Sequence, residues 1–162
     1  MDEVGEDVTR FFFLMRSPNT HLEFDISTAK EAGEKHPVFY LQYAHARIQS
    51  ILRKVKEVSN DAWQMPAKEE LNLLQHETEK ALIKKLLAFP GAITAAAVSR
   101  EPHKLITYLN ELASAFTSFY HDCRILGEST GLMVARASLA HATATVLANG
   151  LTILGIEAPD RM

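Results

Sequence analysis

The stretch from residue 37 to residue 54, PVFYLQYAHARIQSILRK, constrains the fold of this chain most strongly. Pro37 suits the first turn of a helix, and neither glycine nor proline interrupts the residues that follow it. Apolar residues then recur at helical spacing: Leu41, Ala44, Ile48, Leu52 and Val55. Because residues at this spacing share one side of an α-helix, the stretch predicts a long helix with one buried face.

One flank of this predicted helix carries aromatic and basic side chains: His36, Tyr40, Tyr43, Arg47 and Lys54. Residues 36–56 contain four Lys or Arg residues and no Asp or Glu, although the whole chain has a formal net charge of −3. Aromatic rings can stack on unpaired RNA bases while cations contact phosphates, so the flank is a candidate RNA-binding surface. The alternative is a core helix whose flank is simply solvated.

Five further segments predict helices by their apolar periodicity: 6–16, 67–88, 92–99, 102–124 and a stretch that ends near Leu154. The run Phe11–Met15 is apolar on all sides, which predicts a buried segment, and we favour a helix over a short strand. The expected fold class is therefore all-α, a bundle of about five or six helices with short connections.

Several of these helices allow detailed predictions. In the segment 67–88, leucines such as Leu71 are expected to point inward and acidic residues, the pair Glu77 and Glu79 included, to be solvated. Phe89-Pro90-Gly91 should end or kink that helix. Ser99 is a candidate N-cap for the next helix, with Pro102 in its first turn. That helix carries the most regular apolar pattern of the chain: Leu105, Leu109, Leu112, Phe116, Phe119 and Cys123.

Composition favours a cytoplasmic protein. The N-terminus lacks the basic start and apolar run of a signal peptide, and the single cysteine, Cys123, fits a reducing compartment. Residues 137–156 carry no charge and approach the length of a membrane span. They also contain polar residues and many alanines, so we interpret them as a helix buried among other helices, with no membrane partner.

The motifs of enzyme active sites are absent from the sequence. There is no G-x-G-x-x-G, no G-x-x-x-x-G-K-[ST] and no G-x-S-x-G. None of the seven histidines forms an H-x-x-x-H pair with an acidic partner, so no metal site is expected. From pattern alone we expect no catalytic residue in this chain.

Five segments, in order and covering nearly the whole chain, resemble the C-terminal region of arginyl-tRNA synthetases. They are DVTRFFFLMRSP at 7–18, HPVFYLQYAHARIQSILRK at 36–54, LLAFPGAI at 86–93, EPHKLITYLNELASAFTSFYHDCRIL at 101–126 and ARASLAHATATVLANGLTILGIEAPDRM at 135–162. The combination of YAHARI with the APDRM ending carries most of the specificity, and it favours the arginine enzyme over other class I enzymes such as the cysteine enzyme.

The resemblance implies a helical anticodon-binding domain of the DALR type over residues 36–162. Residues 1–35 would be the helical connection from a catalytic domain that is missing here. The HIGH-like and KMSKS-like motifs of that domain, which uses ATP and arginine, do not occur in this sequence. The chain should therefore be a fragment of an arginine–tRNA ligase that needs no cofactor of its own and is inactive alone. Its expected partners are arginine tRNA and its own catalytic domain.

The same resemblance points to individual residues that contact the anticodon. Tyr40 and Arg47 match loop-contacting positions of the family on the central helix, Tyr120 matches an aromatic residue that meets anticodon bases, and Met162 matches a C-terminal residue near those bases. The same basic helix adds three candidates for RNA contact: Tyr43 and Lys54 on the flank, and Arg53 beside it in sequence. The alternative is a DALR-like scaffold that binds proteins and not RNA.

Overall fold

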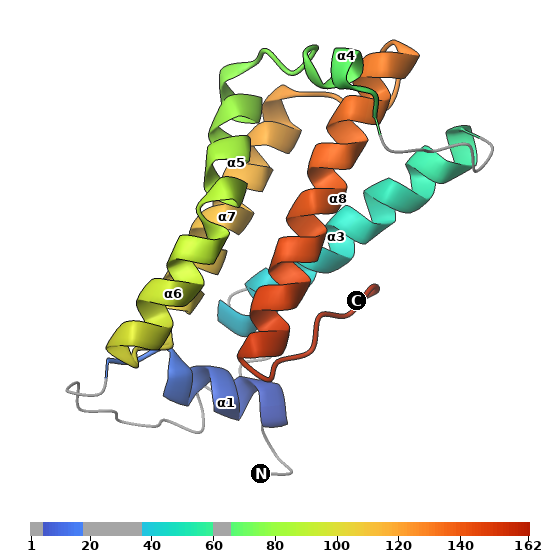
Figure 1. Cartoon of the computed structure of the whole chain (residues 1–162). Helices are drawn as coiled ribbons and strands as arrows, with labels where there is room; N and C mark the ends of the chain where they lie inside the picture. Colours follow the sequence, from blue (N-terminus) through green and yellow to red (C-terminus); the bar gives the residue numbers. More distant parts are fainter. Residues whose placement is uncertain (1–4, 18–36, 60–65) are drawn as a thin grey trace.

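The structure is a computed structural model, and it describes residues 5–17, 37–59 and 66–162 (Figure 1). These residues form seven helices and no strand. Their bounds are α1 Glu6–Leu14, α3 Pro37–Val58, α4 Lys68–Leu71, α5 Glu77–Leu87, α6 Phe89–Ser99, α7 His103–Asp122 and α8 Thr130–Ile153. The predicted all-α bundle is confirmed. The expectations for His36, for the first domain boundary at residue 35 and for the remaining connecting residues lie outside the described residues.

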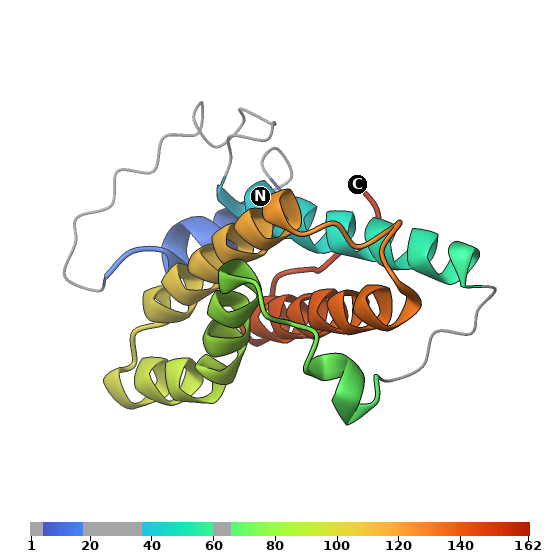
Figure 2. The ribbon, with the colours of Figure 1, turned by 90° about the horizontal axis from the view of Figure 1, so that it is seen from above.

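Three long helices form the centre of the bundle. Helix α8 packs against both α3 and α7, which also contact each other, while α5 and α6 form a bent column along α7 (Figures 1 and 2). Helix α1 lies across one end of the bundle, close to the C-terminal end of α8 (Figure 1). The predicted apolar faces of α3 and α7 are buried, including Leu41 and Ile48 on α3 and Leu109 and Phe119 on α7.

Helix α8 is long and apolar enough to cross a membrane by length and composition. In the structure it is instead a core helix, because alanines such as Ala135, Ala137 and Ala140 are buried in the bundle. Small side chains let neighbouring helices approach closely. At Gly150 an added Cβ atom would lie 2.5 Å from Cδ2 of the buried Leu109 on α7.

The single helix predicted for residues 67–88 is wrong, because two helices occupy this segment. Helix α4 ends at Leu71, whose side chain is exposed and not inward-facing as expected. A capping box then starts α5: Glu79 Oε2 accepts a hydrogen bond from the backbone N–H of His76 at 2.8 Å. Because this cap satisfies a backbone donor at a new helix start, it favours a break over a continuous helix.

Glu79 also contradicts its predicted solvation. The side chain is fully buried, and its Oε1 accepts a hydrogen bond from Nε of Arg136 on α8 at 2.7 Å. The same guanidinium donates from NH1 to the carbonyl oxygen of Arg124 at 2.6 Å and lies 3.3 Å from Oε1 of Glu128. A buried carboxylate requires a hydrogen-bonding or ionic partner, and the partner of Glu79, Arg136, lies 57 residues away in the sequence.

Of the two predictions for the ends of α6, one is confirmed and one is wrong. The predicted kink is confirmed, since α5 and α6 meet at Ala88 and are bent by 40°. The prediction that Ser99 caps the next helix is wrong. Ser99 is the last residue of α6, and its hydroxyl donates to the carbonyl oxygen of Ala95 at 2.7 Å. Arg100 then adopts a left-handed conformation with φ of 56°, and Pro102 precedes α7.

Helix α1 and the C-terminal tail hold each other against the bundle. Phe11 is completely buried, but Phe13 is 59% exposed, so the run Phe11–Met15 is only partly buried and not wholly buried as predicted. The Asp7 carboxylate accepts hydrogen bonds from Nε2 of Gln42 at 2.9 Å and from the backbone N–H of Glu157 at 3.2 Å. One carboxylate thus joins α1, α3 and the tail.

Candidate nucleic-acid interface

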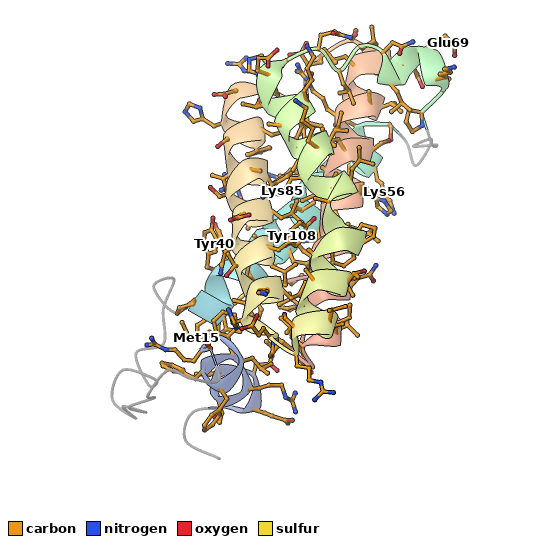
Figure 3. All side chains as sticks on the ribbon, turned by 60° about the vertical axis from the view of Figure 1, so that its left-hand side comes forward. Met15, Tyr40, Lys56, Glu69, Lys85 and Tyr108 are labelled. Atoms are coloured by element: carbon orange, nitrogen blue, oxygen red, sulfur yellow. The ribbon has the colours of Figure 1, made fainter. Side chains whose placement is uncertain are left out.

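Helices α3 and α7 form a groove at the predicted basic flank. It is lined by Tyr40, Tyr43, Ala44 and Arg47 from α3 and by Phe116, Thr117 and Tyr120 from α7, and its volume is about 270 Å³. Figure 3 shows Tyr40 on α3 at the edge of α7. We call this hollow the tyrosine groove. It brings together four of the residues predicted to contact RNA.

Two of the rings in the tyrosine groove are accessible. Tyr40 is 38% exposed and Tyr43 is 45% exposed, because both project from α3 on the side away from its buried face. The backbone that carries both tyrosines is held in place, because their sequence neighbours Leu41 and Ala44 are buried in the core. Accessible rings on a rigid element suit stacking with an unpaired base.

Tyr120 connects the groove to the core. Its ring stacks on Phe116 with centroids 6.0 Å apart and an interplanar angle of 13°. The guanidinium carbon of Arg47 lies 5.0 Å from the centroid of the same ring. This cation–π contact holds Arg47 within the groove, where its planar donors can meet a base edge or a phosphate.

The fourth tyrosine of the chain has a different environment. Tyr108 is buried, its hydroxyl donates to the carbonyl oxygen of Lys85 at 2.8 Å, and burial raises its pKa to about 12. Tyr108 therefore serves the packing of α5 against α7. Three of the four tyrosines in the sequence, by contrast, line one groove.

A second hollow adjoins the tyrosine groove, and we call it the turn pocket. It lies between α3 and the connection from α7 to α8, and its volume is about 250 Å³. Its lining consists of Ile51, Lys54, Tyr120, Arg124, Ile125 and Leu126. The predicted residue Lys54 thus lies beside Tyr120, although not in the tyrosine groove itself.

Arg53 and Met162, which are also predicted RNA contacts, line neither hollow. Arg53 instead donates from NH1 to the carbonyl oxygen of Asp160 at 3.2 Å. His45 donates from Nδ1 to the carbonyl oxygen of Pro159 at 3.0 Å. The tail therefore runs along the side of α3 opposite the tyrosine groove, and Met162 is 65% exposed at its end. RNA contact by Arg53 and by Met162 therefore remains a prediction.

Among the lining residues that sequence reasoning did not assign to the site, Phe116 and Arg124 bear most on binding. Phe116 was assigned only to the core stripe of α7, yet it also lines the tyrosine groove. Arg124 lies one residue beyond the C-cap of α7, where periodicity no longer assigns a face. The i, i+4 spacing of Phe116 and Tyr120 could have linked Phe116 to the groove, whereas the sequence contains no signal that places Arg124 beside Lys54.

The structure gives no metal or nucleophile site in the part of the chain that it describes. No group of three His, Cys, Asp or Glu side chains in these ranges could hold a metal ion. Cys123 is buried, its sulfur lies 3.6 Å from the hydroxyl oxygen of Thr78, and burial raises the pKa of its thiol. A buried thiol with a raised pKa is a poor nucleophile.

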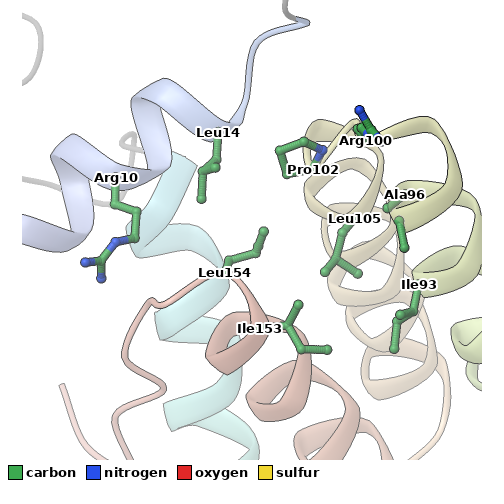
Figure 4. A pocket seen from close by; sticks show the side chains of 10 residues that line it. Arg10, Leu14, Ile93, Ala96, Arg100, Pro102, Leu105, Ile153 and Leu154 are labelled. Atoms are coloured by element: carbon green, nitrogen blue, oxygen red, sulfur yellow. The ribbon is translucent and has the colours of Figure 1, made fainter.

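A third hollow, of about 500 Å³, lies beside α1 (Figure 4), at the end of the bundle opposite the α7–α8 turn (Figure 1). It is lined mainly by apolar side chains from α1, α6, α7 and α8, among them Leu14, Ile93 and Leu105. Arg10 and Arg100 lie at its edge (Figure 4). None of the predicted RNA contacts lines this hollow.

Comparison with known proteins gives one family. Residues 41–162 match the family described as the DALR anticodon binding domain. The arginine–tRNA ligase of Salinibacter ruber is 56% identical over the whole chain, and that of Desulfitobacterium hafniense is 47% identical. The chain spans only 28% and 29% of their lengths. The structure of Thermus thermophilus arginyl-tRNA synthetase superposes with a TM-score of 0.78 and 34% identity, covering 96% of this chain and 26% of that one.

Proposed function

Because the chain belongs to the family of DALR anticodon-binding domains, we propose that it binds the anticodon stem-loop of arginine tRNA. The observation that carries this proposal is the tyrosine groove, in which Tyr40, Tyr43, Tyr120 and Arg47 lie together at the surface. The names of the relatives, arginine–tRNA ligase, support arginine tRNA as the proposed RNA.

The proposed mechanism is recognition without chemistry. Anticodon bases unstack from the loop and lie on the rings of Tyr40 and Tyr120, each stack contributing about 1–3 kcal/mol. Arg47 offers its planar donors to a base edge or phosphate, and Lys54 neutralises backbone charge. Arg53 and Met162 would contribute from the tail side of α3 if the RNA reaches around that helix.

In a longer protein the module would serve catalysis that occurs elsewhere. We propose that the parent is a cytoplasmic arginine–tRNA ligase, whose catalytic domain uses ATP to attach arginine to the tRNA. The share of its relatives that this chain spans leaves room for such a domain. The chain alone should not charge tRNA, so any arginine- and ATP-dependent charging by the pure chain would contradict this proposal.

The exposure of the groove favours RNA binding over a scaffold role. Tyr40, Tyr43 and Arg47 are exposed on α3, and no other helix among the described residues covers them. Accessible rings around a guanidinium suit stacked bases and phosphates, and tyrosine and arginine are enriched at protein interfaces as well. The scaffold alternative instead predicts that the chain does not discriminate between RNA loops.

The test is a titration of the chain with an arginine anticodon stem-loop at two salt concentrations, beside a loop whose middle anticodon base is changed. Tighter binding of the natural loop at both salt concentrations supports the proposal. Equal binding of the two loops that disappears at higher salt would overturn it, because non-specific charge attraction behaves in this way.

A further inference from the structure

We propose that the turn pocket is a second RNA subsite, in which Arg124 and Lys54 bind the backbone phosphate of the nucleotide that adjoins the base in the tyrosine groove. This inference rests on the proposed function, and it assigns a binding role to Arg124. The ligand is the phosphodiester of single-stranded RNA.

The two hollows meet at one side chain. Tyr120 lines both the tyrosine groove and the turn pocket, so a nucleotide whose base lies in the groove has room for its phosphate in the adjoining pocket. Consecutive nucleotides of a single strand need such adjoining sites, with rings for the bases and cations for the backbone. The arrangement around Tyr120 provides both.

The charges of the turn pocket are available for a ligand. Lys54 and Arg124 are exposed, and within the described ranges neither side chain forms an ion pair. Three lysines on α5 and α7 are, by contrast, paired: Lys80 with Glu77 at 3.4 Å, Lys85 with Glu111 at 2.5 Å and Lys104 with Glu101 at 2.6 Å. In the part of the chain that the structure describes, no acidic residue lines either hollow. The turn pocket therefore has a net positive charge that attracts an anionic ligand.

The backbone of the pocket is fixed from within the bundle. The carbonyl oxygen of Arg124 accepts the 2.6 Å hydrogen bond from Arg136, which is itself paired with the buried Glu79. Ile125, the next residue, is buried and packs into the core. The Arg124 side chain thus extends from an anchored backbone, which reduces the cost of ordering it around a ligand.

The test compares Arg124→Ala, Arg124→Lys and a control, Lys84→Ala, in the full chain. Lys84 is an exposed lysine on α5, outside both hollows. The probes are the arginine anticodon stem-loop and a series in which each loop phosphate in turn is replaced by a neutral methylphosphonate. Affinity is measured over a range of salt concentrations.

Arg124→Ala should bind more weakly than wild type, and its log–log salt slope should be shallower by about 0.7, the value for one lost contact to a single-strand phosphate. Arg124→Lys should recover most of the slope. One methylphosphonate position should weaken the wild type more than Arg124→Ala, because in the variant only Lys54 still contacts that phosphate, while the preference for the natural middle base persists.

Two failures are distinguishable. If the wild type prefers the natural loop but Arg124→Ala matches Lys84→Ala in affinity and slope, this inference is wrong and the proposed function stands. If the wild type shows no preference between loops, the proposed function fails and the subsite fails with it.

Discussion

Tyr120 shows how one side chain belongs to both the core and the surface of this domain. Its ring stacks on Phe116, contacts Arg47 and lines both hollows. A substitution here would disturb packing together with binding. Tyr40, which is 38% exposed and packs less, isolates the contribution of binding more cleanly.

The change Tyr40→Ala should weaken stem-loop binding by about 1–3 kcal/mol, because one base loses its stacking partner. Fluorescence anisotropy with a labelled stem-loop measures this loss. Leu87→Ala, at an exposed residue on α5, is the control for losing exposed apolar surface. If both variants bind as tightly as wild type, Tyr40 does not stack on the RNA.

Arg47→Lys should reduce affinity although the charge is kept. Lysine cannot reproduce the planar donors of the guanidinium or its contact with the Tyr120 ring, 5.0 Å away. The salt slope of binding should stay at its wild-type value, since the number of neutralised phosphates is unchanged. A variant with full affinity would show that Arg47 acts only as a point charge.

At the scale of elements, the bundle depends on a close approach of α7 and α8. Gly150 allows this contact, because a Cβ atom at that position would overlap the fully buried Leu109. Helix α8 is correspondingly rich in small residues. Long-range hydrogen bonds then connect elements whose pairing the apolar pattern does not specify, such as α5 with α8 through Glu79 and Arg136.

Gly150→Ala should destabilise the domain by about 1–3 kcal/mol, the usual cost of inserting atoms into a packed core. Urea unfolding measures the change. Gly91→Ala on α6 is the matched control, because its Cβ would meet no atom within 4 Å and alanine favours the helix. Equal stability of the two variants would show that α7 and α8 can separate without cost.

Arg136→Met should cost about 3–5 kcal/mol, because the buried Glu79 carboxylate would lose its ionic partner. The substitution Arg100→Met, at an exposed arginine, controls for general loss of positive charge. Thermal unfolding of both variants is the measurement. An unchanged midpoint for Arg136→Met would contradict the role assigned to this pair in anchoring the turn.

At the scale of the whole molecule, the parts predicted best from sequence are those with regular apolar spacing. The buried faces of α3 and α7 follow directly from residues such as Ile48 and Leu112. The break between α4 and α5 was missed, because the capping interaction of Glu79 outweighs the continuous pattern of leucines. Burial of Glu79 could not be predicted either, since its partner Arg136 lies 57 residues away.

The candidate site divides in the same way. Tyr40, Tyr43 and Arg47 could be grouped from one helix, since a fixed angle separates successive residues. Arg124 and Lys54 meet only through the packing of α3 near the end of α7. Charge alone could not show on which side of α3 Arg53 lies. In the structure Arg53 faces the C-terminal tail and donates a hydrogen bond to the carbonyl oxygen of Asp160.

The measurement that tests the central claim most directly is photocrosslinking of the chain to an arginine anticodon stem-loop that carries 4-thiouridine in its loop, with the crosslinked peptides identified by mass spectrometry. We predict crosslinks in the segments 40–47 of α3 and 116–124 around the end of α7. Crosslinks confined to α5 and α6, with none in these two segments, would contradict the assignment of the tyrosine groove as the RNA-binding surface.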